Sequence, residues 1–219
     1  MISKINRQSY QKFQSRILLI SEKIISLLIT IYMANKLSYE DIGFWSQILF
    51  AASLYTSISG LNLSNGIIAI VPRINTIKDK FELIFKSGLI LFLISIILSI
   101  FTIFFRDIFG NLLFNNSLNI YFILTILSIG IVEMLLEFIL YSYRSIRDFK
   151  ASNIILILRI IPRLSVFIGI YNNDIRLMLN LYLYTYLVCF LFLILNLIFS
   201  NKENIFFVLK ERINPNMFF

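Results

Sequence analysis

Four long stretches of this sequence contain no charged residue, and they constrain the fold more than any other feature. Residues 42–72, 87–105, 108–132 and 177–201 lack Asp, Glu, Lys and Arg. A helix needs about 20 residues to cross a hydrocarbon core of about 30 Å, so each stretch is long enough to cross a membrane. Only helices and closed barrels satisfy the whole backbone in lipid. Barrel strands would alternate in polarity, and these stretches do not. We therefore predict an all-α membrane protein.

The hydrophobic pattern predicts about six transmembrane helices. Glu22 and Lys23 interrupt the first apolar segment and no small-residue cleavage site follows, so we interpret it as a span and not as a cleaved signal. The predicted organisation is a basic leader at 1–14, a six-span lobe at 15–199, and a cytoplasmic tail or truncated inter-lobe linker at 200–219. The spans are expected at 15–36, 43–71, 86–106, 118–142, 152–171 and 177–199.

The positive charges between the spans predict the orientation. The loops of one side hold most of them, whereas those of the other side hold only Lys36, Arg106 and Arg176. Because cytoplasmic loops of membrane proteins are enriched in Lys and Arg, we expect the basic side and both termini to lie in the cytoplasm. The basic side carries Lys4, Arg7, Lys12, Arg16, Arg73, Lys78, Lys80, Lys86, Arg144, Arg147, Lys150, Lys202, Lys210 and Arg212.

The composition argues against an enzyme. The sequence has no histidine and a single cysteine, Cys189, which removes the commonest general base and the commonest metal ligands. It also has no phosphate-binding glycine-rich loop, no GxSxG and no HExxH motif. The net charge of +8 is explained by topology and anionic lipid, since the charges lie in loops. We therefore expect no catalytic residue, metal, cofactor, ATP hydrolysis or nucleic-acid partner.

Six charged residues remain inside the predicted spans, where charges are costly and are functional candidates. Four of the six form a pattern, because the two acids of span four are spaced i,i+4 and share a helix face, and so do the two arginines of span five. Spans four and five are expected to form an antiparallel hairpin with its turn at Asp148. Glu137 and Arg159 are equally far from this turn, as are Glu133 and Arg163, so each acid is expected at the same depth as one arginine. The six are Glu22, Lys23, Glu133, Glu137, Arg159 and Arg163.

Two interpretations of this pattern stay open. In the first, Glu137–Arg159 and Glu133–Arg163 are structural ion pairs of a hairpin. In the second, Arg159 and Arg163, with Lys23, bind an anionic head group in a cavity open to the cytoplasm. The acids Glu133, Glu137 and Glu22 would then compensate charge when the site is empty, or couple transport to an ion.

Span two is more polar than the other spans. Ser53, Ser57, Gly60 and Ser64 recur at helical spacing, which predicts either close helix packing or a wet cavity wall. Gly66 and Pro72 would permit a bend near its inner end. We interpret Trp45, with Tyr39 and Phe44, as an aromatic belt at the outer interface.

The start of the chain resembles a known family. A basic leader and Arg16-Ile-Leu-Leu precede the segment ANKLSYEDIGFWSQILFAASLYTSISGLNLSNGI at 34–67. Its acidic pair, its Gly-aromatic step and the Gly/Asn-rich end of the second span are similar to those of polysaccharide flippases. These are the O-antigen and lipid-linked oligosaccharide transporters of the multidrug/oligosaccharidyl-lipid/polysaccharide exporter superfamily. The residues concerned are Glu40, Asp41, Gly43, Phe44, Gly60, Asn62 and Gly66.

The resemblance implies one six-span lobe of a two-lobed, ion-coupled flippase in the bacterial cytoplasmic membrane. Such a protein moves polyprenyl-pyrophosphate-linked oligosaccharides to the outer leaflet for O-antigen or capsule synthesis, through a cation-lined cavity. Its expected partners are the lipid-linked oligosaccharide, membrane lipids and a second six-span lobe or homodimer copy. Four alternatives remain: a half-size transporter, an inert fragment, a glycan polymerase or glycosyltransferase, and a half-size multidrug or ion exporter.

Overall fold

The computed structural model describes residues 2–114 and 119–200, and the predicted tail or linker at 200–219 lies almost wholly outside them. The described residues form helices and no strand. The basic leader is continuous with the first span in one helix. In chain order the helices are α1 (Ile2–Lys36), α2 (Tyr39–Gly60), α3 (Leu63–Ile70), the short 3₁₀ helix η1 (Val71–Arg73), α4 (Ile77–Phe104), α5 (Arg106–Phe114), α6 (Ile120–Ser145), α7 (Phe149–Tyr171) and α8 (Ile175–Ser200).

Short polar side chains mark where several helices begin. Ser38, Thr76 and Asp148 each accept a hydrogen bond from the backbone N–H three residues ahead. These bonds satisfy donors that the first turn of a helix leaves free. Helices therefore follow one another closely, with only Leu37 and Ser38 between α1 and α2.

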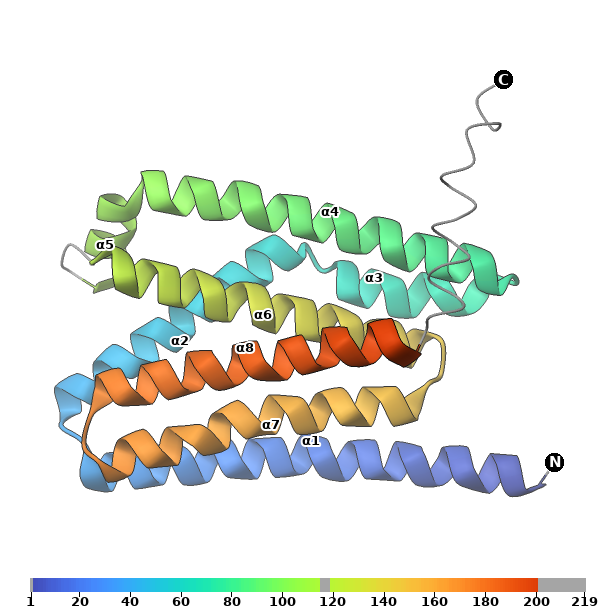
Figure 1. Ribbon diagram of the computed structural model, residues 1–219, viewed down its shortest axis with the longest axis horizontal. Helices are drawn as coiled ribbons and strands as arrows, with labels where there is room; N and C mark the ends of the chain where they lie inside the picture. Colours follow the sequence, from blue (N-terminus) through green and yellow to red (C-terminus); the bar gives the residue numbers. More distant parts are fainter. Residues whose placement is uncertain (1, 115–118, 201–219) are drawn as a thin grey trace.

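The long helices lie side by side as a bundle (Figure 1). α7 packs against both α1 and α8, while α6 packs against α2 and α3. α7 and α8 approach each other closely at Gly169, where an added Cβ would lie 2.4 Å from the Cα of Met178. At the other end of α7, Asn153 hydrogen-bonds with Ser15 of α1. α7 thus holds the first and last long helices together.

The second predicted span is broken. α2 and the segment Leu63–Arg73 meet at an angle of 47°. The break lies at Leu61 and Asn62, which both adopt the left-handed conformation with φ of 42° and 57°. The bend is therefore several residues before Gly66 and Pro72, where we expected it, and Pro72 lies within η1.

The loops that carry the most positive charge meet at one end of the bundle. The N-terminus of α1, the turn between η1 and α4, the turn between α6 and α7, and the end of α8 all lie at the right of Figure 1. The α1–α2 and α7–α8 connections and α5 lie at the opposite end. Charges that are far apart in sequence thus form one basic end.

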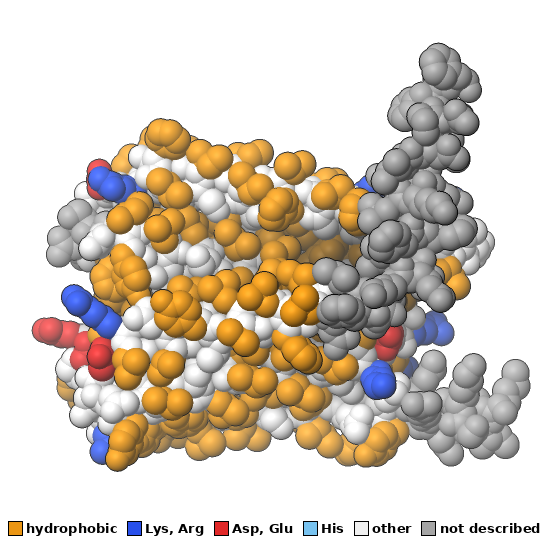
Figure 2. Space-filling model, viewed as in Figure 1, with side chains coloured by type: hydrophobic (Ala, Val, Ile, Leu, Met, Phe, Trp, Pro, Cys, Tyr) orange, Lys and Arg blue, Asp and Glu red, His pale blue; other side chains and the backbone are white. Residues whose placement is uncertain are grey.

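The sides of the bundle are apolar. In Figure 2 hydrophobic side chains cover the visible flank, and the coloured charges lie near its two ends. Five described helices are long and apolar enough to cross a membrane, or six if the bent pair of α2 with Leu63–Arg73 is one span. The fold is that of a multi-pass α-helical membrane protein, as predicted. The predicted number of about six spans is reached only if the bent pair counts as one of them.

Candidate functional site

A buried ion-pair cluster joins α1 to α7 at the level of Glu22. The Glu22 side chain is 5% exposed, and its Oε1 lies 2.8 Å from Nη2 of Arg163 and 3.5 Å from Nη2 of Arg159. Arg163 also donates through Nη1 to the Ser26 hydroxyl at 2.5 Å. Ser26 in turn donates to the backbone carbonyl of Glu22. One carboxylate therefore holds two guanidinium groups that lie one helical turn apart on α7.

These partners differ from those expected at equal depth in the α6–α7 hairpin. Within the described part of the chain, neither Glu137–Arg159 nor Glu133–Arg163 forms an ion pair. The physical reason is the rotation of α7, which turns both arginines toward α1. Glu133 and Glu137 remain close enough to Arg159 to interact with it electrostatically.

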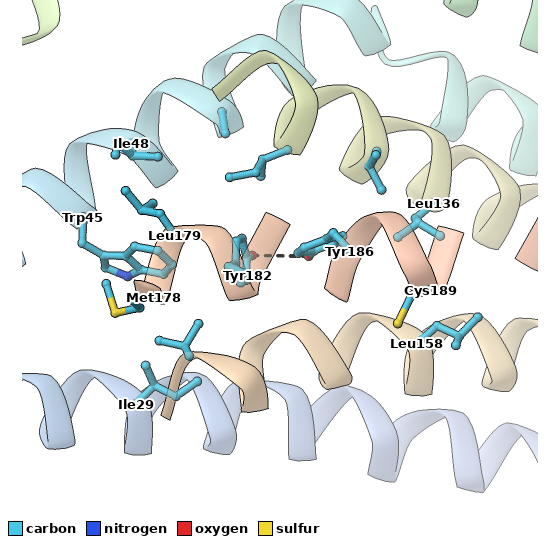
Figure 3. Close-up of a cluster of buried hydrophobic side chains, with 14 of the residues drawn as sticks. Ile29, Trp45, Ile48, Leu136, Leu158, Met178, Leu179, Tyr182, Tyr186 and Cys189 are labelled. Atoms are coloured by element: carbon cyan, nitrogen blue, oxygen red, sulfur yellow. Dashed lines mark hydrogen bonds between the residues drawn. The ribbon is translucent and has the colours of Figure 1, made fainter. Parts of the chain in front are cut away.

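Glu133 is instead held by α8. The Tyr186 hydroxyl donates to Oε1 of Glu133 at 2.9 Å, and the Tyr182 hydroxyl lies 3.5 Å from the same oxygen. Both tyrosines are buried, and they stand on successive turns of α8 with a hydrogen bond between them (Figure 3). Neither tyrosine was predicted from the sequence, although a tyrosine pair spaced i,i+4 inside an uncharged span is itself a signal of a buried polar site.

A cavity of about 270 Å³ adjoins the two clusters. Arg163 and Glu133 both line it, so a cationic and an acidic group face one space. Five helices contribute to its wall, and the charged pair lies well inside α6 and α7 and not at their ends. The lining residues are Ser26, Ile29 and Thr30 of α1, Trp45, Leu49 and Ser53 of α2, Glu133 of α6, Arg163 and Val166 of α7, and Tyr182 of α8.

Trp45 does not belong to an outer aromatic belt. It is 6% exposed and packs edge-on against Tyr182 with ring centroids 5.3 Å apart. The interpretation was wrong for this residue because α2 turns its Trp45 face toward α8. Of the residues predicted for the second span, Ser53 lines the cavity, Ser57 is exposed, and a Cβ at Gly60 would meet no atom within 4 Å. The close approach of α2 to α6 lies instead at Ala52 and Tyr55, which face Gly130.

The remaining candidates lie at the margin of this site. Lys23 is exposed and makes no ion pair with a described residue, since its neighbour Glu22 takes the buried face of α1. Glu137 is half-buried and has neither a hydrogen bond nor an ion pair to the described residues. The described residues also contain no group of three or more His, Cys, Asp or Glu side chains fit to hold a metal ion.

The arrangement suits binding of a polar or charged group. Two arginines pair with Glu22, Arg163 and Glu133 line one cavity, and the cavity wall adds hydroxyl groups from Ser26, Thr30, Ser53 and Tyr182. Charged groups inside a bundle are retained where they face protein or a cavity. A site of this kind, inside a bundle with an apolar flank, defines a multi-pass membrane protein with a polar interior. No family model, curated protein or solved structure matches the chain.

Proposed function

We propose that this chain is a transport lobe that moves a polyprenyl-pyrophosphate-linked oligosaccharide across the bacterial cytoplasmic membrane. One observation carries the proposal: Arg163 forms an ion pair with buried Glu22 and lines a cavity inside the bundle. A guanidinium group is a strong ligand for phosphate oxygens. The flippase resemblance of residues 34–67 supplies the substrate class.

In this proposal the acids balance the arginines while the cavity is empty. Glu22 neutralises one of the two guanidinium charges, and an incoming pyrophosphate replaces the carboxylate as their partner. Glu133, held by Tyr186 and Tyr182, is the proposed ion-coupling group because it lines the same cavity as Arg163. The broken second span supplies a point about which the lobe bends, as discontinuous helices do in other transporters. The activity involves no catalysis and no ATP hydrolysis.

The test is complementation of bacterial cells that lack their own surface-glycan flippase. The protein is compared with Glu22→Gln/Arg159→Gln/Arg163→Gln, which removes both guanidinium groups without leaving the buried Glu22 carboxylate unpaired, and both surface display of the glycan and protein level are measured. The control variant, Arg106→Ala/Arg176→Ala, removes two exposed cations from the end of the bundle opposite the basic end. We expect loss of display at normal protein level for the first variant alone. Equal display by both variants would contradict the proposal.

A second candidate rests on the other wall of the cavity. Trp45, Tyr182 and Glu133 line it together, and aromatic faces with a carboxyl group attract organic cations. This composition favours an exporter of cationic compounds. Efflux of a cationic dye from cells expressing the protein, abolished by Glu133→Gln, would support the exporter. Dye retention equal to that of cells without the protein would exclude it.

A further inference from the structure

A second cavity, of about 340 Å³, opens at the basic end of the bundle and shares no lining residue with the first cavity. It lies where α1, the α3–η1 segment and the α6–α7 turn meet. Its cations are Lys12, Arg144 and Arg147, and Ile68 and Pro72 form an apolar wall. None of the described residues that line it is acidic. Three positive charges therefore surround one open space.

The three cations reach this space from two separate parts of the chain. Arg144 lies in the last turn of α6, and Arg147 follows it in the turn to α7. Lys12 comes from α1, and its ammonium group stands 5.4 Å from the ring centroid of Phe149, which also lines the cavity. This cation–π contact holds Lys12 beside the two arginines. The cluster is thus a product of the fold and not of sequence proximity alone.

The backbone at the α6–α7 turn is specialised. Arg147 adopts φ of 64°, a left-handed conformation that residues other than glycine rarely take. Its N–H donates to the carbonyl of Arg144, and the N–H of Asp148 donates to that of Tyr143. Asp148 is the nearest acid in sequence, but it caps α7 by accepting from the N–H of Ala151. The turn therefore places two guanidinium groups at the cavity while its acid is engaged elsewhere.

We propose that this cavity, between Lys12, Arg144 and Arg147, binds the phosphate group of an anionic ligand. Guanidinium forks match phosphate oxygens in geometry and charge, and an ammonium group adds a third positive contact. The apolar wall of Ile68 and Pro72 suits a phosphate that is attached to a lipid, because the apolar part of the lipid can contact this wall while the phosphate contacts the cations. The site is distinct from the Glu22–Arg163 cluster, and it binds its ligand whether or not the chain transports anything.

Binding is measured on the purified full chain in detergent, by native mass spectrometry. The probes are phosphatidic acid and, as a lipid without net charge, phosphatidylcholine. The test variant is Arg144→Gln/Arg147→Gln. The matched control, Lys80→Gln/Lys86→Gln, removes two cations of α4 that do not line the cavity. Circular dichroism and size exclusion establish that each variant retains its helices and its size.

We expect wild type to bind phosphatidic acid in preference to phosphatidylcholine. The test variant should bind phosphatidic acid at least about tenfold more weakly, the factor that one lost charge-assisted hydrogen bond supplies. The control should stay within about twofold, because exposed charges outside a site contribute little. Equal loss in both variants, or no loss in the test variant, would overturn the proposal. If the double variant does not fold, Lys12→Gln takes its place, since Lys12 is exposed. Unchanged affinity of Lys12→Gln for phosphatidic acid would then overturn the proposal.

Competition with inorganic pyrophosphate distinguishes the source of the phosphate. Displacement of phosphatidic acid by pyrophosphate supports a site that recognises phosphate itself, free or attached to a lipid. Binding of phosphatidic acid that pyrophosphate does not displace supports a site for a lipid head group. If phosphatidylcholine binds as tightly as phosphatidic acid, the cavity has no preference for anions and the proposal is wrong.

Discussion

Glu22 of α1 and Arg163 of α7 form an ion pair of 2.8 Å with side chains only 5% and 19% exposed. The same carboxylate also contacts Arg159. A buried charge is tolerated where a partner and hydrogen bonds compensate it, and its loss leaves the partner uncompensated. Glu22 is therefore the buried counter-charge of two partly buried arginines.

Replacing Glu22 by glutamine should destabilise the protein strongly. Breaking a buried pair by removing one partner typically costs about 3–5 kcal/mol, and here two guanidinium groups lose their counter-charge. The measurement is unfolding in mixed detergent micelles. As a control, Glu82→Gln breaks the exposed 2.7 Å contact with Lys86 and should cost less than about 1 kcal/mol. If the two variants unfold alike, the Glu22 cluster does not stabilise the fold.

The sequence predicted the members of this cluster better than their pairing. Glu22, Arg159 and Arg163 are recognisable because charges are rare inside spans. Depth along a hairpin placed Glu133 level with Arg163, and both do line one cavity. Which acid pairs with the arginines depends on how α7 is rotated between α1 and α8. That rotation is set by tertiary packing, including the close approach of Gly169 to Met178.

The Gly169–Met178 contact gives a second prediction. A Cβ at position 169 would lie 2.4–2.7 Å from backbone atoms of Met178, so Gly169→Ala must push α7 and α8 apart. We expect a loss of about 3 kcal/mol or more, at the upper end of overpacking costs. Gly43→Ala is the control, since a Cβ there meets no atom within 4 Å. It should be neutral or stabilise α2 by about 0.5–1 kcal/mol. Equal unfolding midpoints for the two variants would contradict the close approach.

The tyrosine contacts of Glu133 differ in length, and this difference is testable. Tyr186→Phe removes a hydrogen bond of 2.9 Å and should cost about 1–3 kcal/mol, because it leaves a half-buried acceptor short of a partner. Tyr182→Phe removes a contact of 3.5 Å to the same oxygen and should cost less. Both rings keep their packing in these variants. The reverse order of stability would show that Tyr182, and not Tyr186, holds Glu133.

The break between α2 and α3 predicts opposite effects of one substitution at two positions. Leu61 has φ of 42°, and a residue with a side chain loses about 1–2 kcal/mol in this conformation. Leu61→Gly should therefore maintain or raise stability. Leu54→Gly, within α2, should lower it by about 1 kcal/mol or more, since glycine is unfavourable inside a helix. Loss of stability at Leu61 equal to that at Leu54 would indicate a continuous helix.

The position of this break shows where reading of the sequence fails. The second stretch was recognised as a span, and Gly66 and Pro72 predicted a bend near its inner end. The chain turns instead at Leu61 and Asn62, where leucine gives no local preference for a left-handed conformation. Helix class and approximate boundaries follow from composition over about 20 residues. A turn made by two residues depends on the packing of α2 and α3 against α6, which the sequence alone does not display.

The two ends of the bundle should face opposite sides of the membrane, with the basic end in the cytoplasm. Lys80 is partly exposed at the basic end, and Arg176 is exposed at the opposite end. In a Cys189→Ser background we replace each in turn by cysteine and treat intact cells with a membrane-impermeant maleimide. Arg176→Cys should be labelled at once, and Lys80→Cys only after the membrane is permeabilised, because Lys and Arg are retained on the cytoplasmic side. The parent chain with Cys189 alone is the control, since that side chain is 5% exposed within the fold and should not react. Labelling of Lys80→Cys in intact cells would show the opposite orientation, with the Lys12–Arg144–Arg147 cavity on the outer face.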